Sequence, residues 1–345
     1  MATLKDIAKQ CGTSVATVSY VLNGRGAEMR ISPATRQLVE AAARELGYTA
    51  APAARPPKIA VFWPQRSVEA MLPAVVNGLN TALAREPSPV ELLLRPYDGN
   101  HLSRDESLWT PRSYDAAIIV SAGSADLEAL TRRRAEVPTV LLNRMLPGYS
   151  WVSVDHREAG RLAGELAVRS GGEDVALVLN PLPFVGMDLR GQGFCAACAA
   201  HGVSMADRIL YCGNNLDGGY ELGVRLARSG QLPRVIACMY DLAAFGLVRA
   251  LVEAHVPVGD TVQVLAAGFS FSQFFARCTP PLTMVDLRIE EATERAVRVA
   301  VDMAGQRLAA PVEQTLPPLV IYRDSCPCPT GEARAAALAG ELDAT

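Results

Sequence analysis

The sequence predicts an α/β protein in two parts, a small helical domain at the N-terminus and a larger core built on parallel β-sheet. Residues 3–48 hold three stretches whose apolar residues recur at helical spacing. From residue 58 onward, short β-rich runs alternate with segments mostly long enough to hold a helix, which is typical of a doubly wound parallel sheet. With 345 residues and an apolar fraction of 50%, the chain can form more than one buried core.

Charge is distributed unevenly between the two parts. Residues 1–58 carry eight basic and four acidic side chains, a net charge of +4, which leaves −7 for the rest of a chain whose formal net charge is −3. A basic N-terminal segment on an acidic core suggests a polyanionic partner for that segment alone.

The three predicted N-terminal helices have clear start and stop signals. Thr3, with Asp6 three residues later, is the expected N-cap of the first helix, and Gly12 ends it. The second begins near Thr13 or Ser14 and ends at Asn23-Gly24, and the third opens with Ser32-Pro33 and ends at Gly47. Two helices joined by a turn of about three residues in a basic segment fit a helix-turn-helix. The apolar stripes are Leu4, Ile7, Ala8 and Cys11; Val15, Val18, Val21 and Leu22; and Val39, Ala42, Ala43 and Leu46.

The segment TLKDIAKQCGTSVATVSYVLNG…ISPATRQLVEAAARELGY, residues 3–48, resembles the DNA-binding domain of LacI-family transcriptional regulators. The run T-L-K-D-I-A followed by A-T-V-S-x-V-L-N-G is highly specific for that domain. The resemblance implies a DNA-binding transcriptional regulator that binds a pseudo-palindromic double-stranded operator as a homodimer. It favours a repressor over an activator. Phosphate contacts would supply most of the affinity and make it salt-dependent.

Short hydroxyl side chains near the predicted helix starts suit phosphate contacts, which fix the register without reading sequence. The resemblance assigns base reading to Val15, Ala16 and Tyr20, and many members have Arg where Tyr20 stands, so a bidentate Arg–guanine contact is not available here. Val15 also fits the apolar stripe, which leaves it between a base contact and the core. The predicted DNA-contacting residues are Thr3, Ser14, Val15, Ala16, Thr17, Ser19, Tyr20, Asn23, Arg30, Thr35, Arg55 and Pro57.

The connecting segment, residues 49–57, departs from the family pattern. The family has a short hinge helix ending in A-R-x-L, whose Leu wedges into the minor groove. Here Ala54 and Arg55 match, but Pro57 stands at the Leu position after Pro56, and two prolines cannot continue a helix. Pro57 is either an apolar wedge itself or part of a stiff spacer without groove contact, which we favour; a stub helix over 51–55 stays open.

The core also resembles the LacI family, in VDHREAGRLAGELAVRSG, in R-G-Q-G-F at 190–194 and in PPLTMV at 280–285. The resemblance implies a periplasmic-binding-protein-like core over 58–330 with two α/β subdomains, three crossovers and a small-molecule cleft. We expect about 58–154 plus 283–309 in one subdomain and about 155–282 plus 310–330 in the other, followed by a tail over 331–345. The predicted strands are 58–63, 90–95, 114–121, 139–143, 151–155, 174–180, 234–240 and 261–268.

Family members often bind sugars or purines in the cleft through an Arg, an Asn-Asp pair and an acid of G-[FY]-D-D. Here Gly268-Phe269-Ser270-Phe271 lacks both acids, which predicts a more aromatic cleft for a flatter or less polar ligand than a sugar. Arg190 could instead form a structural ion pair. The core could also bind no effector and serve dimerisation or a protein partner. The predicted effector-binding residues are Trp63, Arg190, Tyr240, Asp241, Ser270 and Phe271.

We expect no metal, cofactor or catalytic site. Cys195, Cys198 and Cys212 fall on a predicted helix and strand where thiols pack as small hydrophobes, and all eight cysteines are expected to be reduced. No nucleophile elbow, P-loop or dinucleotide-binding glycine motif is present, so we predict a regulator rather than an enzyme. No apolar run reaches the ~18 residues that span a bilayer and no signal segment begins the chain, so we expect a cytoplasmic protein without a membrane partner.

Overall fold

The structure is a computed structural model of the 345-residue chain, and it describes residues 3–22, 29, 31–46, 55–65, 71–110, 113–181, 184–269, 272–308 and 311–327. The chain divides into two compact units, Met1–Pro56 and Pro57–Thr345, which we call the head and the body. The predictions for residues 51–54 of the hinge and for the 331–345 tail lie outside the described residues.

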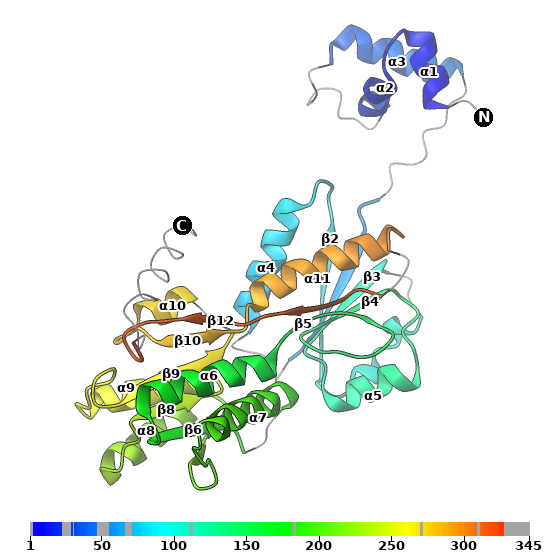
Figure 1. Ribbon diagram of the computed structural model, residues 1–345. Coiled ribbons are helices and arrows are strands. Elements are labelled where there is room, and N and C mark those ends of the chain that lie inside the picture. Colours follow the sequence, from blue (N-terminus) through cyan, green and yellow to red (C-terminus); the bar gives the residue numbers. More distant parts are fainter. Residues whose placement is uncertain are drawn as a thin grey trace. The chain divides into compact units, whose positions relative to one another are not determined.

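The head consists of the three predicted helices, α1 (Leu4–Cys11), α2 (Val15–Leu22) and α3 (Pro33–Glu45) (Figure 1). The predicted caps are confirmed: Thr3 and Asp6 form a capping box, Gly12 is left-handed after α1, and Ser32 accepts a hydrogen bond from the backbone N–H of Thr35. Fully buried Ile7, Val18 and Val39 meet at the centre, which joins one stripe from each helix into a single small core.

The first sheet of the body is parallel throughout, in the order β11-β5-β4-β3-β1-β2. Ile59 and Val61 face a cluster shared with helices α4 and α11, whereas Ala60 and Phe62 face the other side, towards helix α5 and the short turns η1 and η2. Burial on both faces explains why its central strands are continuously apolar. Its strands are β1 (Lys58–Pro64), β2 (Glu91–Tyr97), β3 (Ala116–Val120), β4 (Thr139–Leu142), β5 (Ser150–Val154) and β11 (Glu313–Leu316), and its helices are α4 (Leu72–Arg85), α5 (Ser124–Arg132), α11 (Ile289–Ala304), η1 (Leu102–Arg104) and η2 (Glu106–Leu108).

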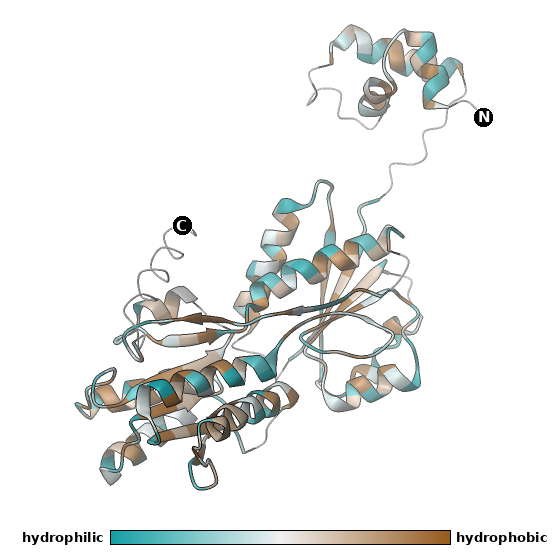
Figure 2. Ribbon diagram, in the orientation of Figure 1, coloured by the Kyte–Doolittle hydropathy of each residue, from teal (hydrophilic) through white to brown (hydrophobic). Residues whose placement is uncertain are grey.

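The second sheet has the order β12-β10-β9-β8-β6-β7, and only β12 among its described strands runs antiparallel to its neighbour. Helices α6 and α7 cover one face, and α8 and α9 cover the other. In Figure 2 the helices carry both teal and brown residues, as amphipathic helices do. The strands are β6 (Val175–Leu179), β7 (Ile209–Tyr211), β8 (Val235–Cys238), β9 (Gln263–Gly268), β10 (Thr283–Asp286) and β12 (Leu319–Ile321), and the helices are α6 (His156–Gly171), α7 (Val185–Ala200), α8 (Leu216–Ser229), α9 (Asp241–Glu253) and α10 (Ser272–Arg277).

Helices α6 and α7 approach each other backbone to backbone. A Cβ built on Gly160 of α6 would lie 1.9 Å from the carbonyl oxygen of Arg190, and one built on Gly193 of α7 would lie 2.0 Å from that of Arg157. No side chain fits at either position while the helices keep this spacing. The close packing fixes where α7 places its own side chains, Arg190 among them.

The chain passes between the two sheets three times, as expected, but two strands lie in the other sheet from the one we assigned. Strand β10 belongs to the second sheet, although the sequence analysis gave residues 283–309 to the first subdomain. Strand β11 pairs with β5 in the first sheet, although residues 310–330 were given to the second. Strand β10 is drawn to the second sheet because it completes a parallel pair with β9, and the chain crosses only after Asp286.

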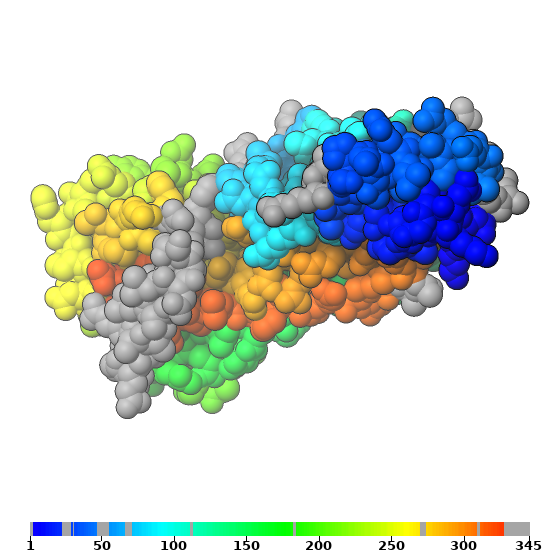
Figure 3. Space-filling model, turned by 90° about the horizontal axis from the view of Figure 1, so that it is seen from above, coloured from blue at the N-terminus to red at the C-terminus, as the bar shows by residue number. Residues whose placement is uncertain are grey.

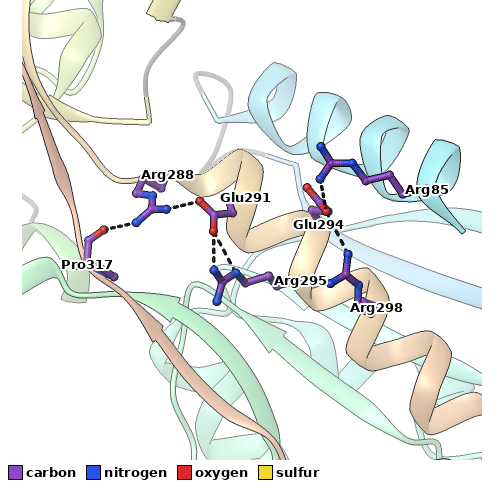
Figure 4. Close-up of polar contacts among 7 residues, drawn as sticks. All are labelled: Arg85, Arg288, Glu291, Glu294, Arg295, Arg298 and Pro317. Atoms are coloured by element: carbon purple, nitrogen blue, oxygen red, sulfur yellow. Dashed lines mark hydrogen bonds and ion pairs between the residues drawn. The ribbon is translucent and has the colours of Figure 1, made fainter. Parts of the chain in front are cut away.

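Two crossovers are tied together by Arg288, the residue directly before α11. Its guanidinium donates a hydrogen bond of 3.2 Å to the carbonyl oxygen of Pro317 and pairs with Glu291, one turn into α11 (Figure 4). Further along, Glu294 of α11 pairs with Arg85 of α4 at 2.6 Å. Figure 3 shows α4 (cyan) beside α11 (orange), in agreement with these contacts.

Candidate functional site

The first turn of α2 presents an exposed face in the head. Ser14 precedes the helix, and its hydroxyl accepts a hydrogen bond of 3.0 Å from the backbone N–H of Thr17. Val15 is 41% exposed and Ala16 is exposed, while Val18 and Val21 fill the core. The alternative that Val15 is a core residue is therefore wrong, because the helix turns this side chain outwards.

Tyr20 lies one helical turn beyond Ala16 and is half-buried, so both residues share one side of α2. Thr17 and Ser19 are half-buried as well. This helix therefore offers two exposed apolar side chains, Val15 and Ala16, with the hydroxyl groups of Thr17, Ser19 and Tyr20 half-buried beside them. No charged group stands on α2.

The remaining predicted DNA contacts are scattered. Thr3 and Thr35 hold their hydroxyl groups in the helix caps, at 2.7 Å from Asp6 Oδ2 and 2.8 Å from Ser32 Oγ. Pro57 opens the body, where its carbonyl oxygen accepts a hydrogen bond of 2.9 Å from the backbone N–H of Glu91. This anchoring favours the spacer interpretation of Pro57 over the wedge. Arg55 is exposed, and Asn23 and Arg30 lie outside the described residues.

A cavity of about 550 Å³ opens between the two subdomains of the body. It lies at the carboxyl ends of β1, β3 and β4, the edge of a parallel α/β sheet at which ligands usually bind. Ser121, Asn143 and Arg144 line it from the first subdomain, and Phe184 and Tyr240 line it from the second. The other described residues of its wall are Pro64, Met71, Gly99, Asn100, Ala122, Gly123, Ser124, Val185, Asp188, Asn214 and Phe269.

Of the predicted effector residues, the described wall of the cavity includes Tyr240. Ser270 and Phe271 lie outside the described residues. Trp63, Arg190 and Asp241 are described but do not line this cavity. Trp63 packs against the main hydrophobic cluster.

Arg190 is fully buried behind the wall. Its guanidinium lies 5.6 Å from the ring centre of Phe184, which itself lines the cavity, and donates a hydrogen bond of 2.7 Å to the carbonyl oxygen of Met239. A second guanidinium nitrogen lies 3.1 Å from Nδ1 of His156. This geometry supports a structural role for Arg190, because both terminal nitrogens of its guanidinium bond inside the protein.

Asp241 is also buried, and its carboxylate accepts hydrogen bonds from the backbone N–H groups of Leu242 and Phe269 at 2.9 and 3.0 Å. Burial raises the pKa of Asp241 to about 6, while these two hydrogen bonds and the charge of Arg190 act in the opposite direction. Burial lowers the pKa of Arg190 to about 10, against the attraction of Asp241. The two charges therefore compensate each other in a site that excludes water.

The polar residues of the first subdomain's wall were not among the predicted effector-binding residues. Asn143 is the last residue of the predicted strand 139–143 and Arg144 directly follows it, so the rule that ligands bind at carboxyl strand ends could have identified them. Arg144 donates to the carbonyl oxygens of Ala122 and Asn143 at 2.8 and 2.6 Å, and burial lowers its pKa to about 10. On the opposite wall, Asp188 supplies an exposed carboxylate.

The described cysteines are free thiols. Cys198 is buried on α7, and burial raises its pKa to about 11, so its thiol packs in protonated form. Within the described ranges, no three His, Cys, Asp or Glu side chains are placed to hold a metal ion. None of the described helices is long and apolar enough to cross a membrane.

Comparison with known proteins identifies both units. Residues 3–50 match the family described as "Bacterial regulatory proteins, lacI family", and residues 168–326 match "Periplasmic binding protein-like domain". The ribose operon repressor of Escherichia coli K12 is 26% identical over 337 residues, which cover 94% of this chain and all of the repressor. A LacI family transcription regulator from Clostridium acetobutylicum superimposes with a TM-score of 0.73 at 25% identity, covering 77% of this chain and 99% of that one. The lac repressor dimer bound to operator and the anti-inducer ONPF gives 0.68 at 20% identity, with coverage of 95% and 99%.

A three-helix head with an exposed helix-turn-helix, joined to a two-subdomain core with a cleft, defines a DNA-binding transcriptional regulator. The chain combines a LacI-family DNA-binding domain with a periplasmic-binding-protein-like domain.

Proposed function

We propose that the chain represses transcription by binding a pseudo-palindromic DNA operator as a homodimer, and that a small molecule in the body's cleft modulates this binding. The relatives support both parts, since one is a ribose operon repressor and another is a repressor dimer bound to operator and a small molecule. The protein would act as a regulator and not as an enzyme, in the cytoplasm, with residues 49–57 as a spacer between the head and a core that spans 58–330.

The observation that carries the DNA-binding proposal is the exposed face of α2. Val15 and Ala16 stand at the first turn with their apolar side chains outwards, where thymine methyl groups would be met in a major groove. Tyr20, one turn later, supplies a phenol in place of a guanidinium. Direct reading of bases is therefore modest, and phosphate contacts supply most of the affinity.

The cleft favours a partly planar ligand over a plain sugar. Phe184, Tyr240 and Phe269 give it three aromatic surfaces, on which a flat ring would stack. Arg144 offers a cation to a carbonyl or anionic group of the ligand.

Binding-site selection from random duplex DNA with the full-length protein tests the DNA-binding proposal. We expect enrichment of two inverted half-sites with a tolerant centre, because Pro57 is anchored to the body. Enrichment of one flexible base step at the centre would instead show that the prolines kink DNA, and failure to enrich any sequence would contradict operator binding.

Exchanging Tyr20 for alanine is expected to reduce discrimination at one base pair of each half-site by roughly tenfold, because a base-pair mismatch typically costs about 1–3 kcal/mol. Ser14→Ala should weaken binding to all duplexes alike, since it removes a helix cap and a phosphate contact. Tyr20→Phe keeps the ring and removes the hydroxyl group, so it distinguishes the contribution of the hydroxyl group to discrimination from that of the ring. Competition binding against single-position variants of the selected site measures all three. An unchanged site preference in Tyr20→Ala would show that the assigned register of α2 is wrong.

Calorimetry with a panel of metabolites tests the effector. A ligand of the cleft should give saturable heat that Tyr240→Ala abolishes. Tyr211→Ala, at an exposed tyrosine of β7 outside the cavity wall, should leave that heat unchanged. If no compound of the panel binds, the core serves dimerisation or a protein partner instead.

A further inference from the structure

A chain of buried hydrogen bonds links the two subdomains behind the cleft. It runs from the carbonyl oxygen of Met239 through Arg190 and His156 to Asn143 and ends at Ser121. The successive distances are 2.7, 3.1, 2.8 and 3.1 Å. The four side chains are between 0% and 7% exposed.

This series of hydrogen bonds passes from one subdomain to the other at a single bond. Arg190 on α7 and His156 at the start of α6 belong to the second subdomain, whereas Asn143 follows β4 and Ser121 follows β3 in the first. The crossing bond therefore joins Nε2 of His156 to Oδ1 of Asn143. Asn143 and Ser121 also line the cavity, so this bond holds part of the ligand-facing wall.

The donors and acceptors along this series of hydrogen bonds match for only one placement of the proton on the ring of His156. A guanidinium can only donate, so Nδ1 of His156 must accept from Arg190. The proton of the neutral ring then stands on Nε2 and is donated to Oδ1 of Asn143, whose amide nitrogen donates to Ser121. A second proton on the ring would place an N–H on Nδ1 against the N–H of Arg190, and this bond would be lost.

The charges around His156 also oppose protonation. Arg190 faces it from α7 and Arg144 faces it from the segment after β4, both as cations. Asp241, at the start of α9, lies near Arg190, and Asp155, directly before His156, uses its carboxylate to cap α6 through the N–H of Glu158. Burial, then Arg190, then Arg144 hold the pKa of His156 well below its usual range.

Taking the proposed function as given, we propose that His156 is a proton-sensitive latch between the two subdomains. Its neutral ring accepts from Arg190 and donates to Asn143. Acidification breaks the bond to Arg190 and sets two cations against each other, which moves the ring out into water, and this movement releases Asn143 and with it part of the cleft wall. The effector response of the regulator is therefore lost in acid before the protein unfolds.

Proton linkage determines that acid favours the released arrangement over the latched one. In the released arrangement the ring contacts water and titrates near its ordinary pKa of about 6.5, whereas in the latched arrangement its pKa lies well below that value. The released arrangement therefore binds more protons below pH 6.5. It gains about tenfold in relative population per pH unit below that point, until the pH reaches the pKa of the latched ring.

Hydrogen–deuterium exchange of the full-length protein, without DNA or ligand, tests the latch. We compare peptides that contain Asn143 or His156 at pH 7.5 and 5.5, after correction for the intrinsic dependence of amide exchange on pH. The expected result is an open population about tenfold larger at pH 5.5, observed as about tenfold faster corrected exchange and confined to the ends of the strands around the cavity. Equal corrected exchange at the two pH values would overturn the proposal.

Two variants separate the latch from a purely structural role. Asn143→Asp places a carboxylate against the ring and between two arginines, which favours the charged ring, so the acid response should disappear. His156→Gln keeps one donor and one acceptor but cannot titrate in this range, and it should remove the response as well. His201→Gln is the matched control, because His201 is an exposed histidine of the same subdomain that pairs with Glu165.

Two outcomes with these variants would contradict the latch: an acid response that persists in Asn143→Asp, or one that disappears in His201→Gln. If His156→Gln does not fold, Asn143→Asp still decides the question. Because neither DNA nor ligand enters the measurement, a negative result leaves operator binding intact, and a failed site selection leaves the latch intact.

Discussion

Gly160→Ala is expected to lower the free energy of unfolding of the body by roughly 3 kcal/mol, the upper end of what overpacking usually costs. The new methyl group would lie 1.9 Å from the carbonyl oxygen of Arg190, and both atoms belong to helix backbones that cannot rotate away. Helices α6 and α7 must therefore separate, and α7 would carry Arg190 away from His156. The loss of stability would come with a loss of the buried hydrogen-bond chain.

Gly191→Ala is the matched control on the same helix. Its methyl group would meet the side chain of Leu179 at 3.4 Å, an ordinary contact. We expect the free energy of unfolding to change by no more than about 0.5 kcal/mol. Chemical denaturation followed by tryptophan fluorescence measures both variants, and it reports the body alone because Trp63, Trp109 and Trp151 all lie there. Equal midpoints for the two variants would show that the helices adjust their spacing easily.

Arg190→Met is expected to cost about 3–5 kcal/mol at neutral pH, the usual effect of removing one partner from a buried pair of charges. It leaves the carboxylate of Asp241 in a water-free site without its cation, and it leaves Nδ1 of His156 and the carbonyl oxygen of Met239 without a donor. Methionine is apolar and fills similar space, so the loss reports charge and hydrogen bonding more than a cavity.

The pH dependence of that loss identifies Asp241 as its source. The folded-state pKa of Asp241 is about 6, above the ordinary value of 3.8, and removal of Arg190 raises it further. The charged carboxylate destabilises the fold above its folded pKa, and protonation relieves this below it. The difference in the free energy of unfolding between Arg190→Met and the protein without the substitution should therefore be large at pH 8 and smaller at pH 5.

Two further variants complete this experiment. Adding Asp241→Asn to Arg190→Met should recover part of the stability. Arg161→Gln removes an exposed arginine that pairs with Glu158, and it should change stability by less than about 0.5 kcal/mol. A loss from Arg190→Met that stays the same between pH 8 and pH 5 would contradict the role given to Asp241.

The head could be predicted almost completely because its signals are local. Thr3, Gly12 and Ser32 each set a helix boundary through contacts within a few residues, and the structure confirms all three. Val15 was the exception, because its position in the apolar stripe did not tell which side of α2 faces the core. Only the packing of α2 against α1 and α3 decides that, and it turns Val15 outwards.

The body was predictable strand by strand but not in its crossings. All eight predicted strands are confirmed, and most of them are apolar runs buried on both faces, whereas the edge strand β2 is half-exposed. Strands β7, β10, β11 and β12 were not among the predicted strands. Three of them, β7, β11 and β12, are short and lie at sheet edges, where half-exposed residues leave little pattern, and β10 is a run of only four residues. The sheet that β10 or β11 joins depends on partners far away in the sequence.

The cleft was the least predictable part. The resemblance assigned Arg190 to the ligand, but no motif shows that His156, 34 residues earlier, takes up its donors. Conversely, Asn143 and Arg144 follow a strand without forming any motif, and they reach the ligand side through the topology of the sheet. The proposal of an altered, more aromatic ligand rests on Phe184 and Phe269 as much as on Tyr240.

The crossing of strands between the two sheets also determines the order in which parts of the fold can be completed during synthesis. The head makes its contacts within its first 56 residues and can fold as soon as they leave the ribosome. The first sheet of the body begins with β1 but gains β11 only about 250 residues later, which corresponds to roughly 12–50 s of synthesis at ~5–20 residues per second. From the completion of β5 until β11 is made, about 160 residues later, the edge of β5 has no neighbour on one side and can pair with another nascent chain. A polypeptide cut short before Glu313 would thus carry a finished DNA-binding head on a body that lacks an edge strand in each of its sheets.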